Sequence, residues 1–177
     1  MGGWGGAGGG GGAGGAGAGA AAAHTPSAPP AAAVAAVKTK ATITSDHLTA
    51  EAAAQAAQAA LKAAGKEGQR VSVAVVDRNG NTLVTLRGDG AGPQSYESAV
   101  KKAYTAVSWN APTSQLVERL KAAPTLKDIP GTLFLAGGAP VAYGIAPIAG
   151  VGVAGAPSGD LDEKFARAGI AAISDGR

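Results

Sequence analysis

The pattern of apolar and polar positions divides the 177-residue chain into a long beginning without periodicity and a patterned remainder. The first patterned stretch, "HLTAEAAAQAAQAALKAAGKEG", is a run of strong helix formers whose apolar face is mostly Ala. Thr49 is a suitable N-cap for this helix, and Glu51 suits its positively polarised first turn. Because Ala side chains are small, we expect this helix to pack closely against the core.

Two β-branched runs follow at residues 71–78 and 81–87, and they meet at Asn79-Gly80. An Asn-Gly pair between two such runs is a strong hairpin signal, because the favoured two-residue turn needs a positive φ at both positions. The sequence therefore predicts an antiparallel hairpin with Asn79 and Gly80 in its turn.

Helical spacing returns over residues 94–109, 113–123 and 159–173, and the segment 130–157 between the last two indicates three short strands. We place the breaks between these strands at Gly137-Gly138 and at residues 147–150. Runs of strands and helices that are segregated along the chain favour an α+β domain over alternating βαβ units. We expect a single α+β domain over residues 43–174, with about five antiparallel strands flanked by helices.

Residues 1–42 differ in composition from the rest of the chain. The first 20 residues hold 13 of the 29 glycines. Such a stretch buries too little apolar surface to offset its backbone entropy, so we predict a disordered Gly/Ala/Pro-rich tail or leader remnant. The run "APPAAAVAAV" resembles the apolar core of a signal peptide, but no Lys or Arg precedes it.

The net charge and the inventory of metal-binding side chains limit which partners and metal sites the chain can have. The formal charge of +3 comes without clusters of Lys or Arg, which argues against a nucleic-acid partner. The chain has no Cys, its one Met is Met1, and its two histidines are His24 and His47. This inventory excludes thiolate metal sites and a multi-His site within one chain, and it leaves His47 as the imidazole of the predicted domain.

Two short motifs near the C-terminus carry competing interpretations. "GVGVAG", residues 150–155, matches a dinucleotide-binding template, but Pro157 follows it and no βαβ unit is available, so a strand closely approached on one face is favoured. "DLDE" places Asp160 and Glu163 on one face of a helix. That spacing can bind a cation through oxygen, although acidic residues are also simply favourable in a first helical turn.

The stretch "SWNAPTSQL", residues 108–116, lies where one helical pattern ends and the next begins. Pro112 suits a helix start, which places Thr113 in the first turn of the following helix. On spacing alone Thr113 either caps that helix or is presented to a ligand, and Trp109 either fills the core or offers apolar surface.

Taken together, "VSVAVVDRNGNTLVTLRGDGAGPQSYESAVKKAYTAVSWNAPTSQL", "PTLKDIPGTLFLAGGAPV" and "GVGVAGAPSGDLDEKFARAG" resemble the GlcG/HbpS-like family from about Leu48 to Ile173. The resemblance implies an α+β protomer that assembles into a homo-oligomer, octameric in the haem-binding branch. It also implies a secreted protein that binds haem and iron, degrades haem with peroxide in a non-classical way, and reports redox or iron stress to the extracytoplasmic domain of a two-component sensor histidine kinase.

The resemblance implies a role in haem binding for Thr113. Beside it we select Trp109 for the porphyrin, and Arg87, Lys101 and Lys102 for the haem propionates. For surface iron the candidate residues are Asp160, Glu163 and His47. No residue is assigned as catalytic. Two alternatives remain open: a GlcG-like or corrinoid-related protein that binds a small ligand without haem, and a purely structural interaction module.

Overall fold

The computed structural model describes residues 35–174. The chain divides into two units, Met1–Thr42 and Ile43–Arg177. The described part of the first unit holds one 3-10 turn, η1 (Thr39–Ala41), and most of the predicted tail lies outside the described residues. The second unit contains the sheet, the four α-helices and every site residue considered below.

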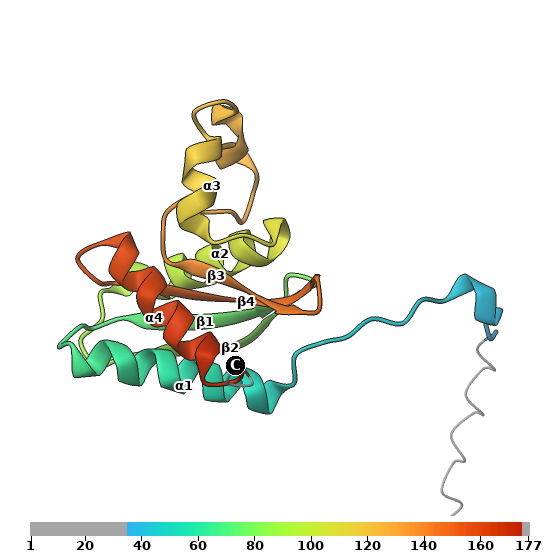
Figure 1. The fold of residues 1–177 in the computed structure, drawn as a ribbon, viewed down its shortest axis with the longest axis horizontal. Helices are drawn as coiled ribbons and strands as arrows, with labels where there is room; N and C mark the ends of the chain where they lie inside the picture. Colours follow the sequence, from blue (N-terminus) through green and yellow to red (C-terminus); the bar gives the residue numbers. More distant parts are fainter. Residues whose placement is uncertain (1–34, 175–177) are drawn as a thin grey trace, which may run out of the picture. The chain divides into compact units, whose positions relative to one another are not determined.

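The second unit is built in the order α1 (Ala50–Lys66), β1 (Ser72–Asp77), β2 (Thr82–Arg87), α2 (Pro93–Trp109), α3 (Thr113–Arg119), η2 (Pro124–Asp128), β3 (Gly138–Tyr143), β4 (Ala146–Ala154) and α4 (Gly159–Ala171). The strands form one antiparallel sheet in the order β2-β1-β4-β3. Helices α1 and α4 cover one face of this sheet and α2 covers the other (Figure 1). The α+β class and the flanking helices are confirmed.

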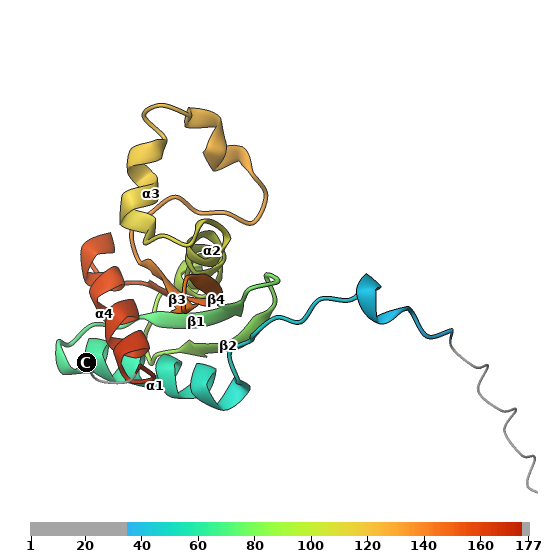
Figure 2. The same ribbon diagram turned by 45° about the vertical axis from the view of Figure 1, so that its right-hand side comes forward.

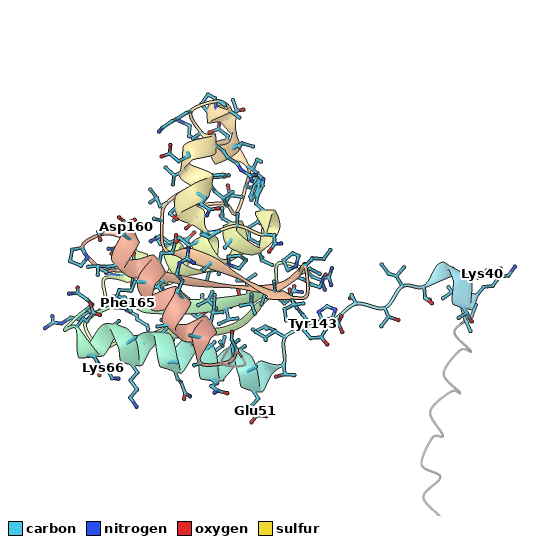
Figure 3. The ribbon with its side chains drawn as sticks, viewed as in Figure 1. Lys40, Glu51, Lys66, Tyr143, Asp160 and Phe165 are labelled. Carbon is cyan, nitrogen blue, oxygen red and sulfur yellow. The ribbon has the colours of Figure 1, made fainter. Side chains whose placement is uncertain are left out.

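The two faces of the sheet are packed differently. Val73 and Val75 of β1 join the cluster beneath α1 and α4, which also includes Phe165 of α4, fully buried (Figure 3). The opposite face presents small residues to α2. A Cβ built on Gly152 would lie 2.1 Å from the carbonyl oxygen of Ala99 in α2. Gly150 and Gly152 of "GVGVAG" therefore admit the backbone of α2, as the strand interpretation predicts.

The sheet has four strands among the described residues, so the prediction of about five is one too many. The missing strand is the stretch around Phe134. Its ring is buried with Ala111 and Leu116, and the backbone N–H of Leu133 donates to the hydroxyl of Thr105 rather than to a neighbouring strand. The break expected at residues 147–150 is also absent, because the chain turns at Gly144 (φ 61°) and β4 then continues to Ala154.

The β1–β2 hairpin is confirmed, but its turn differs from the one predicted. Gly80 has a positive φ of 88°, whereas Asn79 does not. The Gly80 N–H donates to the carbonyl of Asp77, and the N–H groups of Asn79 and Asn81 donate to the Asp77 carboxylate. An acidic side chain thus replaces the second positive-φ residue as the device that closes the turn.

After α2, residues 111–137 extend away from the sheet, and the chain returns to the sheet at β3. This excursion contains α3 and η2 and projects away from the sheet (Figures 1 and 2). It has a small core of its own in which Trp109 meets Phe134 edge-to-face, with ring centroids 5.2 Å apart. The start of α3 is therefore the point where the excursion joins the main body.

Candidate functional site

Thr113 is the first residue of α3, and its side chain is fully buried. Its hydroxyl oxygen accepts the backbone N–H of Gly138 at 2.8 Å and lies 3.4 Å from the carbonyl oxygen of the same residue. Gly138 is the first residue of β3. Thr113 therefore does not cap its own helix: the hydroxyl ties the start of α3 to the start of β3.

The N-terminus of α3 is held instead by a carboxylate from α4. Glu163 accepts the backbone N–H of Ser114 at 3.0 Å on one oxygen, and the Ser114 hydroxyl at 2.9 Å on the other. The second oxygen also accepts Nη2 of Arg167 at 2.7 Å. Pro112 precedes this turn and provides no side-chain cap, so Glu163 supplies the missing acceptor from another element.

A groove lies between the start of α3, β3 and the C-terminal half of α4, and we call it the α4 groove. It has a volume of about 430 Å³. Its lining residues are Pro112, Ala139, Pro140, Arg167, Ile170, Ala171 and Ser174. The walls are mainly apolar, and Arg167 is the one charged residue among them. Thr113 is not among the lining residues; it follows Pro112 in the chain, and its partner Gly138 precedes Ala139.

Lys102 is buried, and it is paired rather than free. Its ammonium lies 2.8 Å from an Asp162 carboxylate oxygen and 3.1 Å from the carbonyl oxygen of Val153. Burial raises the pKa of Asp162, while Lys102 and the N–H of Ala156 oppose that effect. The pair joins α2, the end of β4 and α4. Lys102 and Asp162 also line a surface depression of about 320 Å³ beside Leu135.

The other residues selected for haem lie on β2, which ends at Arg87, and on α2, which contains Lys101 and Trp109. Arg87, at the end of β2, donates from Nε and Nη2 to the carbonyl of Ala91. Lys101 forms an exposed pair with Glu97 at 2.7 Å, and this pairing lowers the pKa of Glu97. Trp109 packs against Phe134 in the excursion. Each of these residues therefore has a partner of its own, and none of them lines the α4 groove.

Of the residues selected for iron, Asp160 and Glu163 lie together on α4, whereas His47 lies before α1. Asp160 is exposed at the start of α4 (Figure 3), and it shares a depression of about 320 Å³ with Glu163, Lys164 and Arg167. His47 is exposed before α1 and contacts the hydroxyl of Ser45 at 2.9 Å. Within residues 35–174, no cluster of three or more His, Asp or Glu side chains has the arrangement of a metal site.

Comparison with known proteins places the chain in a family. A family model described as "Haem degrading protein HbpS-like" matches residues 48–171. The chain belongs to the HbpS-like family. A crystal structure of a double mutant of HbpS from Streptomyces reticuli is 70% identical, with a TM-score of 0.81 over 82% of this chain and 100% of the other.

Two more distant structures share the fold. The Klebsiella pneumoniae protein ORFY is 27% identical, with a TM-score of 0.72 over 80% of this chain and all of its own. A PduOC structure described as a haem complex is 29% identical, with a TM-score of 0.67 over 74% of this chain and 98% of its own. A search of curated proteins found no match. No helix among residues 35–174 is long and apolar enough to cross a membrane.

Sequence reasoning did not select Arg167 or Ser114. A helical wheel places Arg167 four residues after Glu163, which is a signal for an i,i+4 ion pair. No local pattern points to Ser114, because its partner Glu163 lies 49 positions away.

Proposed function

We propose that this protein binds haem in the α4 groove. The observation that carries the proposal is the composition of the groove, which combines apolar walls with one cation in a member of the HbpS-like family. Haem is a flat apolar ring that carries carboxylates on one edge, so it needs an apolar contact surface and positive charge nearby. A volume of about 430 Å³ also falls within the range of known small-ligand sites, roughly 300–1,000 Å³.

The groove fits weakly ligated haem rather than tightly held haem. Its lining offers no imidazole and no sulfur, and the hydroxyl of Ser174 is its one side-chain oxygen. Thr113 is not in the lining, and its hydroxyl already accepts the N–H of Gly138. We propose that Thr113 contributes by fixing the wall of the groove. Bound haem would supply iron redox chemistry with peroxide, and the protein would bind and orient the ring while leaving the iron accessible.

A haem titration followed by absorbance tests this proposal on two neighbouring variants. Ala171 lines the groove and is exposed, so Ala171→Trp fills it without disturbing the core. Ala172→Trp places the same ring one position along, outside the groove lining, and serves as the matched control. We expect Ala171→Trp to weaken haem binding at least tenfold and Ala172→Trp to leave it within twofold of the wild type.

The wild-type spectrum tests the class of ligand. Weak oxygen ligation predicts a high-spin ferric spectrum that Ala substitution of His47 does not change. Saturable binding that both Trp variants share equally would place haem elsewhere on the molecule. Absence of a saturable change in the Soret band with the wild type would favour the small-ligand or interaction-module alternatives.

The remaining family properties are also proposed for this chain. We expect a homo-oligomer, an octamer by resemblance, which light scattering of the full chain tests. Export, iron binding at Asp160 and Glu163, and association with a sensor kinase ectodomain are proposed on the same resemblance. Because Glu163 already holds Ser114 and Arg167, a free cation has to compete with those bonds. A sensor pull-down with and without haem distinguishes a haem-dependent partner from a haem-independent one.

A further inference from the structure

We infer that Arg167 recognises a carboxylate of the bound tetrapyrrole, and that Glu163 orients it for this task. The inference rests on the proposed haem site. It concerns two residues that sequence reasoning treated otherwise, since Arg167 was not selected and Glu163 was selected as a metal ligand.

The first argument is the position of Arg167. It is the one charged residue in the lining of the α4 groove, and no carboxylate shares that lining. Its side chain is 56% exposed, so a ligand can reach the guanidinium without opening the fold. An anionic edge of a ligand in this groove therefore meets one cation and no carboxylate of the lining; the carboxylate that pairs with Arg167, that of Glu163, lies outside the lining.

The second argument is the way Arg167 is held. Glu163 has a side chain that is only 8% exposed, and its three bonds to Ser114 and Arg167 fix it in place. The Glu163 contact uses one terminal nitrogen of Arg167. A guanidinium carries five N–H donors in a rigid fork, so the others remain for a planar carboxylate. Glu163 thus restricts the orientation of the fork without exhausting its donors.

The third argument separates this role from a purely structural one. Glu163 also holds the start of α3, so its loss affects the groove wall and every ligand in the groove. Selection for a carboxylate affects only ligands that carry one. The ratio of the affinities for haem and for its dimethyl ester therefore measures recognition of the carboxylate by the guanidinium. The affinity for either compound alone also depends on whether the groove is intact.

The test is an absorbance titration of the full chain with haem and with haem dimethyl ester, in the same dilute detergent. We expect the wild type to prefer haem about fivefold, the scale of a half-exposed charge pair. Arg167→Gln abolishes the preference. Glu163→Gln keeps an amide oxygen for Ser114 but loosens Arg167, so it reduces the preference. Arg167→Lys keeps the positive charge but lacks the planar guanidinium, so we expect it to retain part of the preference. This variant allows the test to be made if Arg167→Gln is unstable.

Lys164→Gln is the matched control, because it removes one positive charge from the same helix. Lys164 pairs with Glu67 at 2.6 Å and lies outside the α4 groove lining, so its removal leaves the fivefold ratio unchanged. A wild-type ratio of one, or an unchanged ratio in Arg167→Gln, overturns the inference while haem binding stands. Absence of wild-type binding to either compound overturns the proposed function itself.

Discussion

Replacement of Thr113 by Val separates a structural role of its hydroxyl from direct ligation of iron. Val has nearly the same shape, so the change removes the hydroxyl and keeps the volume. The N–H of Gly138 then loses its acceptor, at a position where Thr113 is fully buried and Gly138 is buried as well. An unsatisfied buried donor costs about 1–3 kcal/mol, and we expect a loss of stability in that range.

The matched variant is Thr113→Ser, which keeps the acceptor and removes the methyl group. That methyl lies against Gly138: a Cβ built on the glycine would come within 2.8 Å of it. We expect Ser to cost about 1 kcal/mol, from one buried methyl group, while the Gly138 amide stays protected.

Urea unfolding measures the free energies, and amide hydrogen exchange reports the Gly138 N–H directly. Val should accelerate exchange at Gly138 and Ser should not. If Thr113→Val unfolds within 0.5 kcal/mol of the wild type with Gly138 still protected, the argument for a structural hydroxyl is refuted. Loss of haem in such a stable variant would then indicate direct ligation by Thr113.

Three further substitutions test other parts of the structure. Gly152→Ala drives a Cβ into the backbone of α2 and should cost about 3 kcal/mol or more in urea unfolding, whereas Gly65→Ala, with nothing within 4 Å, should stabilise by about 0.5–1 kcal/mol. Lys102→Met should cost about 3–5 kcal/mol at pH 7, because it leaves the Asp162 charge buried without its partner. Burial already raises the pKa of Asp162, so the folded variant binds a proton more readily than the unfolded chain, and the cost should shrink as the pH falls. Asp77→Ala should cost about 1–3 kcal/mol at pH 7. Burial opposes the ionisation of Asp77, but the bonds from Asn81 and Asn79 outweigh it and lower the pKa, so the difference from wild type should vanish as the pH falls through that lowered pKa.

The elements that sequence reasoning predicted well are those whose pattern is local. The spacing of apolar residues predicts helices α1, α2 and α4. Thr49 caps α1 by accepting the N–H of Ala52, as expected. The hairpin at Gly80 was equally evident. The prediction of a fifth strand is wrong because Phe134 is buried within the excursion instead. There the hydroxyl of Thr105 accepts the backbone N–H of Leu133, so no neighbouring strand is needed. Apolar residues of strand-forming type indicate burial, but they do not indicate which partner buries them.

The candidate site was less predictable, because its bonds are long-range. Thr113 and Glu163 were both selected from the sequence, yet their partners Gly138 and Ser114 lie 25 and 49 positions away. Side-chain type identifies a residue that is able to bind a ligand. It does not show whether the fold has already used that capacity, which here decides between a ligand and a support.

The hydrogen bonds that hold the start of α3 also position residues that line the α4 groove, so a mutation that breaks them affects both the fold and the groove. Thr113 joins α3 to β3 and Glu163 joins α3 to α4, so both links must be intact for Pro112, Ala139 and Arg167 to enclose one space. We therefore expect a variant that breaks either link to lower ligand affinity through the groove, even if neither side chain touches the ligand. Only a quantity that cancels the common loss, such as the ratio between haem and its diester, assigns a residue to recognition. Loss of binding without a measurement of stability does not distinguish a residue that recognises the ligand from one that supports the groove.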